Sequence, residues 1–569
     1  MDYDAGDVRC VCLAGEEILR RIYVVFQDRN WTARPWRIES EEIDDRGDSF
    51  EIRLSARGSF DAEHFAWTAA ITGTSDGTLT YAIDGHTTEP FLRNRLGICV
   101  LHPMAGFAGR ECTVTHPDGT TTLSAFPDAI SPHQPFMDVA AMTWPVSGGL
   151  ARLDFAGEVF ETEDHRNWSD ASYKTYCTPI ALPFPAEVHP GDQVRQAVTL
   201  TLQDVPLTAP SPVATGPVAI TVDDDPTLLP SIGVHLTDQH WTEAEYADLR
   251  ALGLGHLHAD VDLDASDASD RIQGAAARAR RLDARLLLAL HVTDQSTPDE
   301  APAALTEAAD VIDGVWIVHR DQKVTERAIA DEWRSRLGPD LPWGIGTNLY
   351  FTELNRQPPD TAGLAWTTFS VNPQVHASDD RSVMQNTATL AVIACDVPRL
   401  SGATRVHVGP VTLKPRFNPN ATDPESDVSN TDLPADVDAR QSTAFAAAWA
   451  ALAIRGLATP GTISAVSVFD DLGPKGLRAR DDGATETVGT YPASDVLREV
   501  NRAVHMHPTT SDSPEVVDAL VIDGPAGRRA IVINLSGIPQ EARLHGAADA
   551  VIALEPHDVV IADLPGRTS

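Results

Sequence analysis

A regular alternation of short apolar runs and helical stretches, beginning at Ser231, constrains the fold of this chain most strongly. Helical patterns lie between the apolar runs, for example over Glu243–Leu252, Ile272–Leu282 and Thr443–Ile454. Eight such repeats across about 250 residues predict a (β/α)8 barrel, with an open α/β sheet as the structural alternative. The eight predicted strands are 231–236, 256–262, 285–292, 314–319, 343–349, 364–371, 405–413 and 462–469.

The segments on either side of this repeat favour β structure. In roughly the first 205 residues, runs such as Phe65–Thr72 and Leu79–Asp84 are separated by turn signals, which is typical of a β-sandwich. Residues 205–230 contain six prolines and predict a linker, or a strand that crosses between domains. Strand signals return after about Pro508. We therefore expect an N-terminal β-sandwich with its linker over 1–225, a barrel over 226–508 and a small C-terminal β domain over 509–569.

The charge balance argues against two classes of partner. The chain has 82 acidic and 44 basic residues, for a net charge of -38. Such a surface repels phosphate backbones and anionic lipids, so we expect neither nucleic acid nor membranes as partners. Only four of the basic residues are lysines. Dense Asp with so little Lys is typical of a halophilic protein, although a GC-rich genome would give the same bias.

The remaining composition indicates a cytoplasmic protein without a metal or other cofactor. The six cysteines form no CxxC pair, and the N-terminus has no basic segment followed by an apolar one. No apolar run approaches the ~20 residues of a membrane span. Phosphate-binding glycine loops are absent from the sequence, and the H-x-H pair formed by His256 and His258 is a weak metal signal. The sequence leaves the oligomeric state open, and a homo-oligomer is compatible with it.

Polar side chains gather at the ends of the predicted barrel strands, where barrel enzymes carry their active residues. Nearly every strand ends in a group that donates or accepts hydrogen bonds, which suits a polyhydroxylated substrate. The strand-end residues are His235, His258, Asp260, Asp262, His291, His319, Asn348, Glu353, Asn355, Asn372, Gln374, His376, Lys414, Arg416, Asp470 and Asp471.

Three of these residues are the candidates for catalysis. Glu353 lies among apolar and amide neighbours and is the best candidate for a general base, with a helix-start carboxylate as the alternative. His376 could donate a proton to a leaving oxygen, or could be hydrogen-bonded in a loop. Lys414 is one of only four lysines where Arg is the rule, so its position suggests a demand for a point charge beside an oxyanion.

Polar residues inside and outside the repeat are candidates for substrate contacts. Within the repeat, Asp260 could hold a substrate hydroxyl, orient a catalytic group, or make a structural hydrogen bond to a neighbouring strand. The N-terminal domain carries the clusters Arg93–Arg95, Ser131–Pro135, which includes His133, and Arg166–Asp170. These loops could cover the barrel mouth or pack at the domain interface. Lys174 lies in a similar aromatic-containing motif.

Six segments, in this order along the chain, resemble the D-apionate lactonase family. They are FLRNRLGICVLHP (91–103), ISPHQPF (130–136), NWSDASYKTYCTPIALPFP (167–185), GTNLYFTELNR (346–356), VNPQVHASDD (371–380) and TLKPRFNPNAT (412–422). The resemblance implies hydrolysis of D-apionolactone, a branched sugar lactone, to D-apionate in apiose catabolism. Two positions depart from the family pattern: strand eight ends in Asp470 where a Glu is expected, and strand two carries His258 where an Arg is expected.

Lactone hydrolysis needs a base, an oxyanion site and an acid. From residue type and position we expect Glu353 as the base, Lys414 with Arg416 at the oxyanion and His376 as the acid. The predicted substrate-binding residues are Asp260, Asn348, Asn355, Asn372, Gln374, Arg416, Asp470, His133 and Lys174. Two alternatives remain: a glycoside hydrolase that uses Glu353 and Asp470 as paired carboxylates, and a non-catalytic carbohydrate-binding protein.

Overall fold

The structure is a computed structural model that describes residues 1–59, 62–205, 216–238, 240–338, 340–403, 405–421, 433–479, 489–525, 527–545 and 551–564. Part of the predicted linker (206–215) and the last residue of the sixth segment (422) lie outside the described residues. The described residues fall into two compact units. One contains the N-terminal strands, and the other contains the segment Asn167–Asp170, the barrel and the C-terminal strands. Each unit is described by itself.

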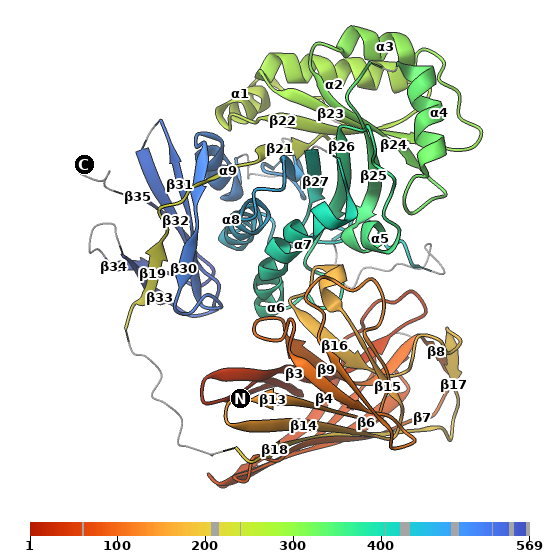
Figure 1. Cartoon of the computed structure of the whole chain (residues 1–569), viewed down its shortest axis with the longest axis vertical. Coiled ribbons are helices and arrows are strands. Elements are labelled where there is room, and N and C mark those ends of the chain that lie inside the picture. Colours follow the sequence, from red (N-terminus) through yellow and green to blue (C-terminus); the bar gives the residue numbers. More distant parts are fainter. Residues whose placement is uncertain are drawn as a thin grey trace. The chain divides into compact units, whose positions relative to one another are not determined.

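The first unit is the predicted β-sandwich, built from two large antiparallel sheets (Figure 1). The seven-stranded sheet has the order β1 (Asp2–Asp4), β2 (Asp7–Leu13), β3 (Glu16–Gln27), β9 (Arg95–Pro103), β16 (Ser172–Tyr176), β15 (Phe160–Glu163) and β12 (Phe136–Val139). The nine-stranded sheet has the order β11 (Thr121–Ala125), β10 (Glu111–Thr115), β13 (Ala141–Val146), β14 (Gly149–Ala156), β18 (Gln193–Gln203), β7 (Leu79–Thr87), β6 (Phe65–Thr74), β5 (Ser49–Arg57) and β4 (Arg37–Asp45). Strands β8 (Phe91–Arg93) and β17 (Ala186–Val188) form a separate pair.

Alternation along single strands builds the core of this sandwich. In β6, Phe65, Trp67, Ala69 and Ile71 are buried, and the residues between them are more exposed. Successive side chains of a strand point to opposite faces, so one face of β6 joins the apolar core and the other remains polar. The same period of two identified this strand in the sequence.

The second unit contains a closed barrel of eight parallel strands, which confirms the predicted (β/α)8 fold. Each predicted strand is present, with ends that differ by no more than three residues. The strands are β21 (Ser231–His235), β22 (His256–Asp262), β23 (Arg285–Val292), β24 (Ile312–His319), β25 (Trp343–Tyr350), β26 (Trp366–Val371), β27 (Arg405–Val411) and β28 (Ala465–Asp470). The helices of the unit are α1 (Glu243–Ala251), α2 (Ala268–Leu282), α3 (Ala301–Ala308), α4 (Arg327–Leu337), α5 (Phe351–Arg356), α6 (Asp380–Gln385), α7 (Thr387–Leu400), α8 (Ala444–Ala458) and α9 (Ala493–Asn501).

Buried histidine side chains fill part of the barrel interior. His256 and His407 both hydrogen-bond the hydroxyl of Ser467, with Nε2–Oγ distances of 2.9 and 2.8 Å. Burial lowers the pKa of His256 to about 3, so this ring is neutral at ordinary pH. The second nitrogen of His256 contacts the hydroxyl of Ser231 at 2.9 Å. His256 thus serves as a hydrogen-bonded core residue.

The C-terminal strands form the predicted small β domain within this second unit. Two sheets are present, with the orders β30 (Thr509–Ser511), β19 (Val218–Val222), β33 (Gln540–His545), β34 (Val551–Leu554) and β20 (Thr227–Leu228), β29 (His505–His507), β31 (Val517–Gly524), β32 (Gly527–Asn534), β35 (Val559–Leu564). The proline-rich region therefore supplies β19 and β20 to these sheets. Arg455 of α8 pairs with Asp518 of β31 at 2.7 Å, which ties the domain to the barrel.

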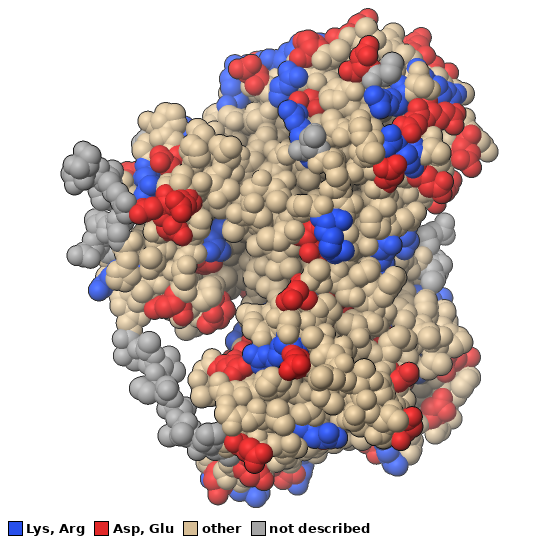
Figure 2. Space-filling model, in the orientation of Figure 1, with Lys and Arg blue, Asp and Glu red and all other residues tan. Residues whose placement is uncertain are grey.

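Charged side chains of both signs alternate over the barrel helices on the face drawn in Figure 2. Within the barrel unit, Arg280 of α2 pairs with Asp310 at 2.5 Å, and Arg271 pairs with Asp238 at 2.7 Å. Exposed pairs of this kind contribute little to stability. Among the described residues, no helix is both long and apolar enough to cross a membrane.

Candidate functional site

Asp260, near the C-terminal end of β22, is the centre of a polar cluster at the mouth of the barrel. Its carboxylate contacts Nε2 of His235 at 3.2 Å, Nε2 of His291 at 3.1 Å and Nη1 of Arg416 at 3.2 Å. These partners come from the ends of β21 and β23 and from the segment after β27. Because parallel strands end at the same rim of a barrel, residues far apart in sequence meet here. We call Asp260, His235, His291, Arg416, Asn348 and Asp470 the mouth cluster.

Hydrogen bonding fixes the charges at the centre of the mouth cluster. Burial acts to raise the pKa of Asp260, but hydrogen bonds from His235 and His291 outweigh it and hold that pKa well below its usual value. Burial also acts to lower the pKa of His235, yet its bonds to Asp260 and Asp470 raise the pKa to about 9. At neutral pH the cluster therefore contains an imidazolium held between two carboxylates.

The rim on both sides of Asp260 is bonded into the same cluster. Arg416 donates from Nη2 to the backbone and side-chain oxygens of Asn348, at 2.7 and 2.8 Å. Asp470, the last residue of β28, contacts Nδ1 of His235 at 2.8 Å and lies 3.8 Å from Nζ of Lys475. Four of the predicted substrate-binding residues, namely Asp260, Asn348, Arg416 and Asp470, are thus brought together.

The segment after β26 carries two predicted residues with unused hydrogen-bonding atoms. Gln374 donates from Nε2 to the carbonyl of Leu413 and to Asp438, each at 2.6 Å, and its backbone nitrogen donates to Asn372 at 3.1 Å. The remaining atoms, Oε1 of Gln374 and Nδ2 of Asn372, are buried and have no partner among the residues that the structure describes. One acceptor and one donor therefore remain for a hydroxyl-bearing ligand or water.

Lys414 lies in the segment after β27, two residues before Arg416, and is half-buried. Its backbone carbonyl accepts a hydrogen bond from Thr412 at 2.7 Å. Within the described parts of the chain, no hydrogen bond or ion pair involves its ammonium. The Lys414 ammonium is therefore available to pair with a negatively charged group of a ligand.

Glu353 lies in the first turn of α5, directly after β25. Its carboxylate accepts a hydrogen bond from the backbone nitrogen of Tyr350 at 3.3 Å, so it caps the start of the helix. The side chain is buried, and this burial raises the pKa of Glu353, whereas the charge of Lys323 acts in the opposite direction. This capping contact matches the alternative considered for Glu353 in the sequence, and its predicted role as base remains a prediction.

His376, in the segment after β26, forms a close pair with Asp170. Its Nδ1 lies 2.7 Å from Oδ2 of Asp170, and its ring meets the indole of Trp168 edge-on, with centroids 6.0 Å apart. Asp170 and Trp168 belong to the segment Asn167–Asp170, which is grouped with the barrel unit. The predicted residue Asn355 of α5 also contacts this segment, through a 2.8 Å bond to the side chain of Asn167.

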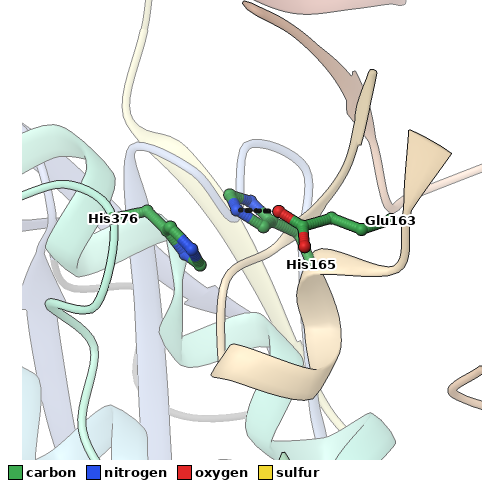
Figure 3. Close-up of side chains that lie close together, drawn as sticks. All are labelled: Glu163, His165 and His376. Atoms are coloured by element: carbon green, nitrogen blue, oxygen red, sulfur yellow. Dashed lines mark ion pairs between the residues drawn. The ribbon is translucent and has the colours of Figure 1, made fainter. Parts of the chain in front are cut away.

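Two predicted residues, His133 and Lys174, belong to the first unit. His133 is exposed, and its backbone carbonyl accepts a hydrogen bond from Ser131 at 2.8 Å. Lys174 is buried and its ammonium lies 2.7 Å from Oε1 of Glu163. Figure 3 shows Glu163 with His165, whose Nε2 is 3.5 Å from the same oxygen. Lys174 is therefore part of a buried ion-pair cluster on β15 and β16.

Three residues of these clusters received no role from the sequence. His235 and His291 stand out in the sequence only as strand-end residues, and this position at the rim is the available signal. Asp170 occurs in a polar cluster of the N-terminal region, and no periodic pattern connects it to His376. Within either unit taken alone, the described residues contain no group of three His, Cys, Asp or Glu side chains spaced to hold a metal ion.

Comparison with known proteins gives the same family in both units. The family model described as D-apionate lactonase, N-terminal domain, matches residues 1–205, and the one described as D-apionate lactonase, TIM barrel domain, matches residues 231–505. A D-apionate lactonase from Brucella anthropi is 29% identical over 98% of this chain and 94% of its own length.

Solved structures with a similar arrangement are much more distant. A GH51 arabinofuranosidase from Xanthomonas axonopodis pv. citri is 11% identical, with 61% of this chain and 98% of that chain covered and a TM-score of 0.41. A β-arabinopyranosidase is 9% identical, with 97% and 94% covered and a TM-score of 0.29. These values are too low to transfer an activity to this chain.

Proposed function

Because this chain belongs to the D-apionate lactonase family, we propose that it is a lactone hydrolase that opens D-apionolactone to D-apionate in apiose catabolism. The observation that carries this proposal is the cationic edge of the barrel mouth. Arg416 is held there by Asp260 and Asn348, and Lys414 lies two residues away without a protein partner for its ammonium among the described residues. A lactone develops an oxyanion on attack and leaves a carboxylate, and both are anions that such an edge stabilises.

During the reaction one proton of the attacking water is transferred twice, first to a base and then to the ring oxygen. A water oxygen attacks the lactone carbonyl carbon while its proton passes to a base, and the oxyanion faces Lys414 and Arg416. The bond between the carbonyl carbon and the ring oxygen then breaks, and the ring oxygen takes a proton. The product hydroxy acid ionises at neutral pH, so each turnover releases one proton to solvent.

Between the two predicted proton-transfer groups, the contacts favour His376 as the group that takes the proton of water. Its partner Asp170 is a carboxylate, which accepts hydrogen bonds only, so Nδ1 of the imidazole carries the proton of this contact. A single imidazole can take a proton from water and return it to the leaving oxygen. Glu353 is held by the start of its own helix, which favours a structural contribution.

Hydroxyl groups of the sugar would be bound along the rim. The free acceptor of Gln374 and the free donor of Asn372 complement a hydroxyl group, which is both donor and acceptor. Asn348 and Asp260 line the same rim and present oxygen atoms fixed by Arg416. These contacts support a polyhydroxylated lactone as substrate over an apolar ester.

Proton release decides the proposal. Purified protein at near-neutral pH in high salt would be given D-apionolactone, a panel of aldonolactones and aryl glycosides. We expect acidification with D-apionolactone and none with the glycosides, and the same assay on Lys414→Met should lose most of it. Aryl release without acidification by any lactone would contradict the proposal and indicate a glycosidase.

A matched pair of variants distinguishes between the two candidate bases. His376→Gln should abolish turnover, whereas Glu353→Gln, which retains a capping oxygen, should retain much of it. Loss of turnover in a folded Glu353→Gln variant, with turnover retained in His376→Gln, would assign the base to Glu353 instead.

A further inference from the structure

The segment Asn167–Asp170 is fixed at its first residue by α5. The backbone carbonyl of Asn167 accepts a 2.6 Å hydrogen bond from Thr352, and its side-chain oxygen accepts a 2.8 Å bond from Asn355. All three residues are buried. The flanking chain belongs to the first unit, but this segment is grouped with the barrel. The barrel therefore holds a short piece of the N-terminal region as part of its own structure.

Asp170, the last residue of the segment, is held by a second anchor, the side chain of Asn386. Asn386 donates from Nδ2 to Oδ1 of Asp170 at 3.2 Å and to the carbonyl of Pro373 at 2.9 Å. Pro373 lies three residues before His376, so one amide group connects Asp170 to the segment that carries the imidazole. Between the two anchors, Ser169 has a φ of 67°, in the left-handed region that residues other than glycine seldom occupy. Such a conformation persists only where the surroundings enforce it, and it is frequent at functional sites.

We propose that Asp170 is a positioning residue for His376: it holds the imidazole in one orientation and keeps its proton on Nδ1, so that Nε2 receives the proton of the attacking water. The 2.7 Å contact between Oδ2 and Nδ1 supplies the bond, and the edge contact with Trp168 restricts rotation of the ring. This inference rests on the proposed function. It assigns a role in the reaction to a residue that precedes the barrel by about 60 positions in the sequence.

Asp170→Asn tests the inference because it retains the shape of the side chain and removes its charge. The amide can donate to the imidazole, which favours the tautomer with the proton on Nε2. We expect kcat to fall by roughly 10²- to 10⁴-fold, with KM changed by no more than about threefold. The matched control is Asp379→Asn, in the segment after β26 that also carries His376: Asp379 caps α6 by accepting from Ser382 at 3.0 Å, and Asn caps equally well, so kcat should stay within about twofold.

A second measurement reports directly which ring nitrogen of His376 carries the proton, and it needs no substrate. Protein labelled with ¹⁵N-histidine would be examined by NMR, with the His376→Gln variant to assign the signal. We expect the wild-type ring to carry its proton on Nδ1 and the Asp170→Asn ring to carry it on Nε2. A purely structural anchor would leave this signal unchanged.

The two measurements separate the failure of this inference from failure of the proposed function. If the wild-type protein hydrolyses lactones but Asp170→Asn retains kcat within about twofold, or retains the wild-type tautomer, Asp170 is not a positioning residue. If the wild-type protein hydrolyses no lactone, the proposed function fails, and an unchanged NMR signal in Asp170→Asn would overturn the positioning role as well.

Discussion

Arg416 holds Asn348 by two hydrogen bonds from a single guanidinium nitrogen, at 2.7 Å to the backbone carbonyl and 2.8 Å to the side-chain oxygen. A second nitrogen of the same group reaches Asp260 at 3.2 Å. The planar guanidinium thus joins the segment after β27 to the ends of β25 and β22. A lysine ammonium is a point charge without this fork and cannot make both connections in the same geometry.

Replacement of Arg416 by Lys should therefore impair the site although the charge is retained. We expect kcat/KM for the lactone to fall by about tenfold to a hundredfold, because the ammonium cannot hold Asn348 and Asp260 together. Steady-state kinetics by proton release would measure this. Arg405→Lys is the control: it lies at the opposite end of the barrel strand β27, pairs with Asp313 at 2.7 Å, and should leave kcat/KM unchanged.

The mouth cluster shows how far the sequence predicts such a site. Once eight β/α repeats are recognised, the strand ends must meet at one rim, so Asp260, Asn348, Arg416 and Asp470 could be expected near one another. Their individual partners could not be read from the sequence, because these depend on strand register and on side-chain rotamers. The same reasoning could not find Asp170, since no periodic pattern records which loop contacts which helix.

The end of β28 shows a limit of the alternation rule. Ser467 lies inside the barrel, where it bonds His256 and His407, so strict alternation would bring Asp471 to that side. Phe469 has a φ of 62°, which interrupts the alternation, and Asp470 joins His235 instead. Sequence patterning could not anticipate this local reversal in an apolar run.

The two adjacent aspartates should consequently differ in what their substitution costs. Asp471 accepts hydrogen bonds from the hydroxyl of Thr237 and the indole of Trp241, each at 2.7 Å, although burial raises its pKa. Asp471→Asn places an amide against these donors and should lower the free energy of unfolding by about 2–4 kcal/mol. Urea denaturation would measure the loss.

Asp470→Asn should instead affect turnover more than stability. Its carboxylate faces His235 in the mouth cluster, so we expect kcat/KM to fall by roughly tenfold or more with a smaller change in the urea midpoint. Equal effects of the two substitutions on both stability and turnover would contradict this division of roles.

The charge on His235 should make stability depend on pH. The folded protein raises the pKa of His235 to about 9, from about 6.5 in an unfolded chain. A raised histidine pKa stabilises the folded state fully below about pH 6.5, and this contribution is lost as the pH rises to about 9. It amounts to at most about 3 kcal/mol.

Comparison of wild type with His235→Gln would isolate this contribution. The difference between their free energies of unfolding should be larger at pH 6.5 than at pH 9.5, as followed by urea denaturation at each pH. His240→Gln, at an exposed position shortly after β21, is the control and should follow the wild-type curve. Parallel curves for wild type and His235→Gln would mean that His235 does not hold its proton more tightly in the folded state.

Backbone conformation at Ser169 should control both stability and turnover. Its φ of 67° is costly for a β-branched side chain and costs glycine nothing. Ser169→Val should therefore lower the free energy of unfolding by about 1–2 kcal/mol. It should also lower kcat, because the turn that places Asp170 beside His376 is disturbed, whereas Ser169→Gly should retain turnover.

Asp283, which ends α2 with a φ of 59° and lies outside the candidate site, gives the matched control. Asp283→Val should cost similar stability in urea and leave kcat at the wild-type value, and a kcat lowered equally by both valine variants would show that the effect is not specific to the segment Asn167–Asp170.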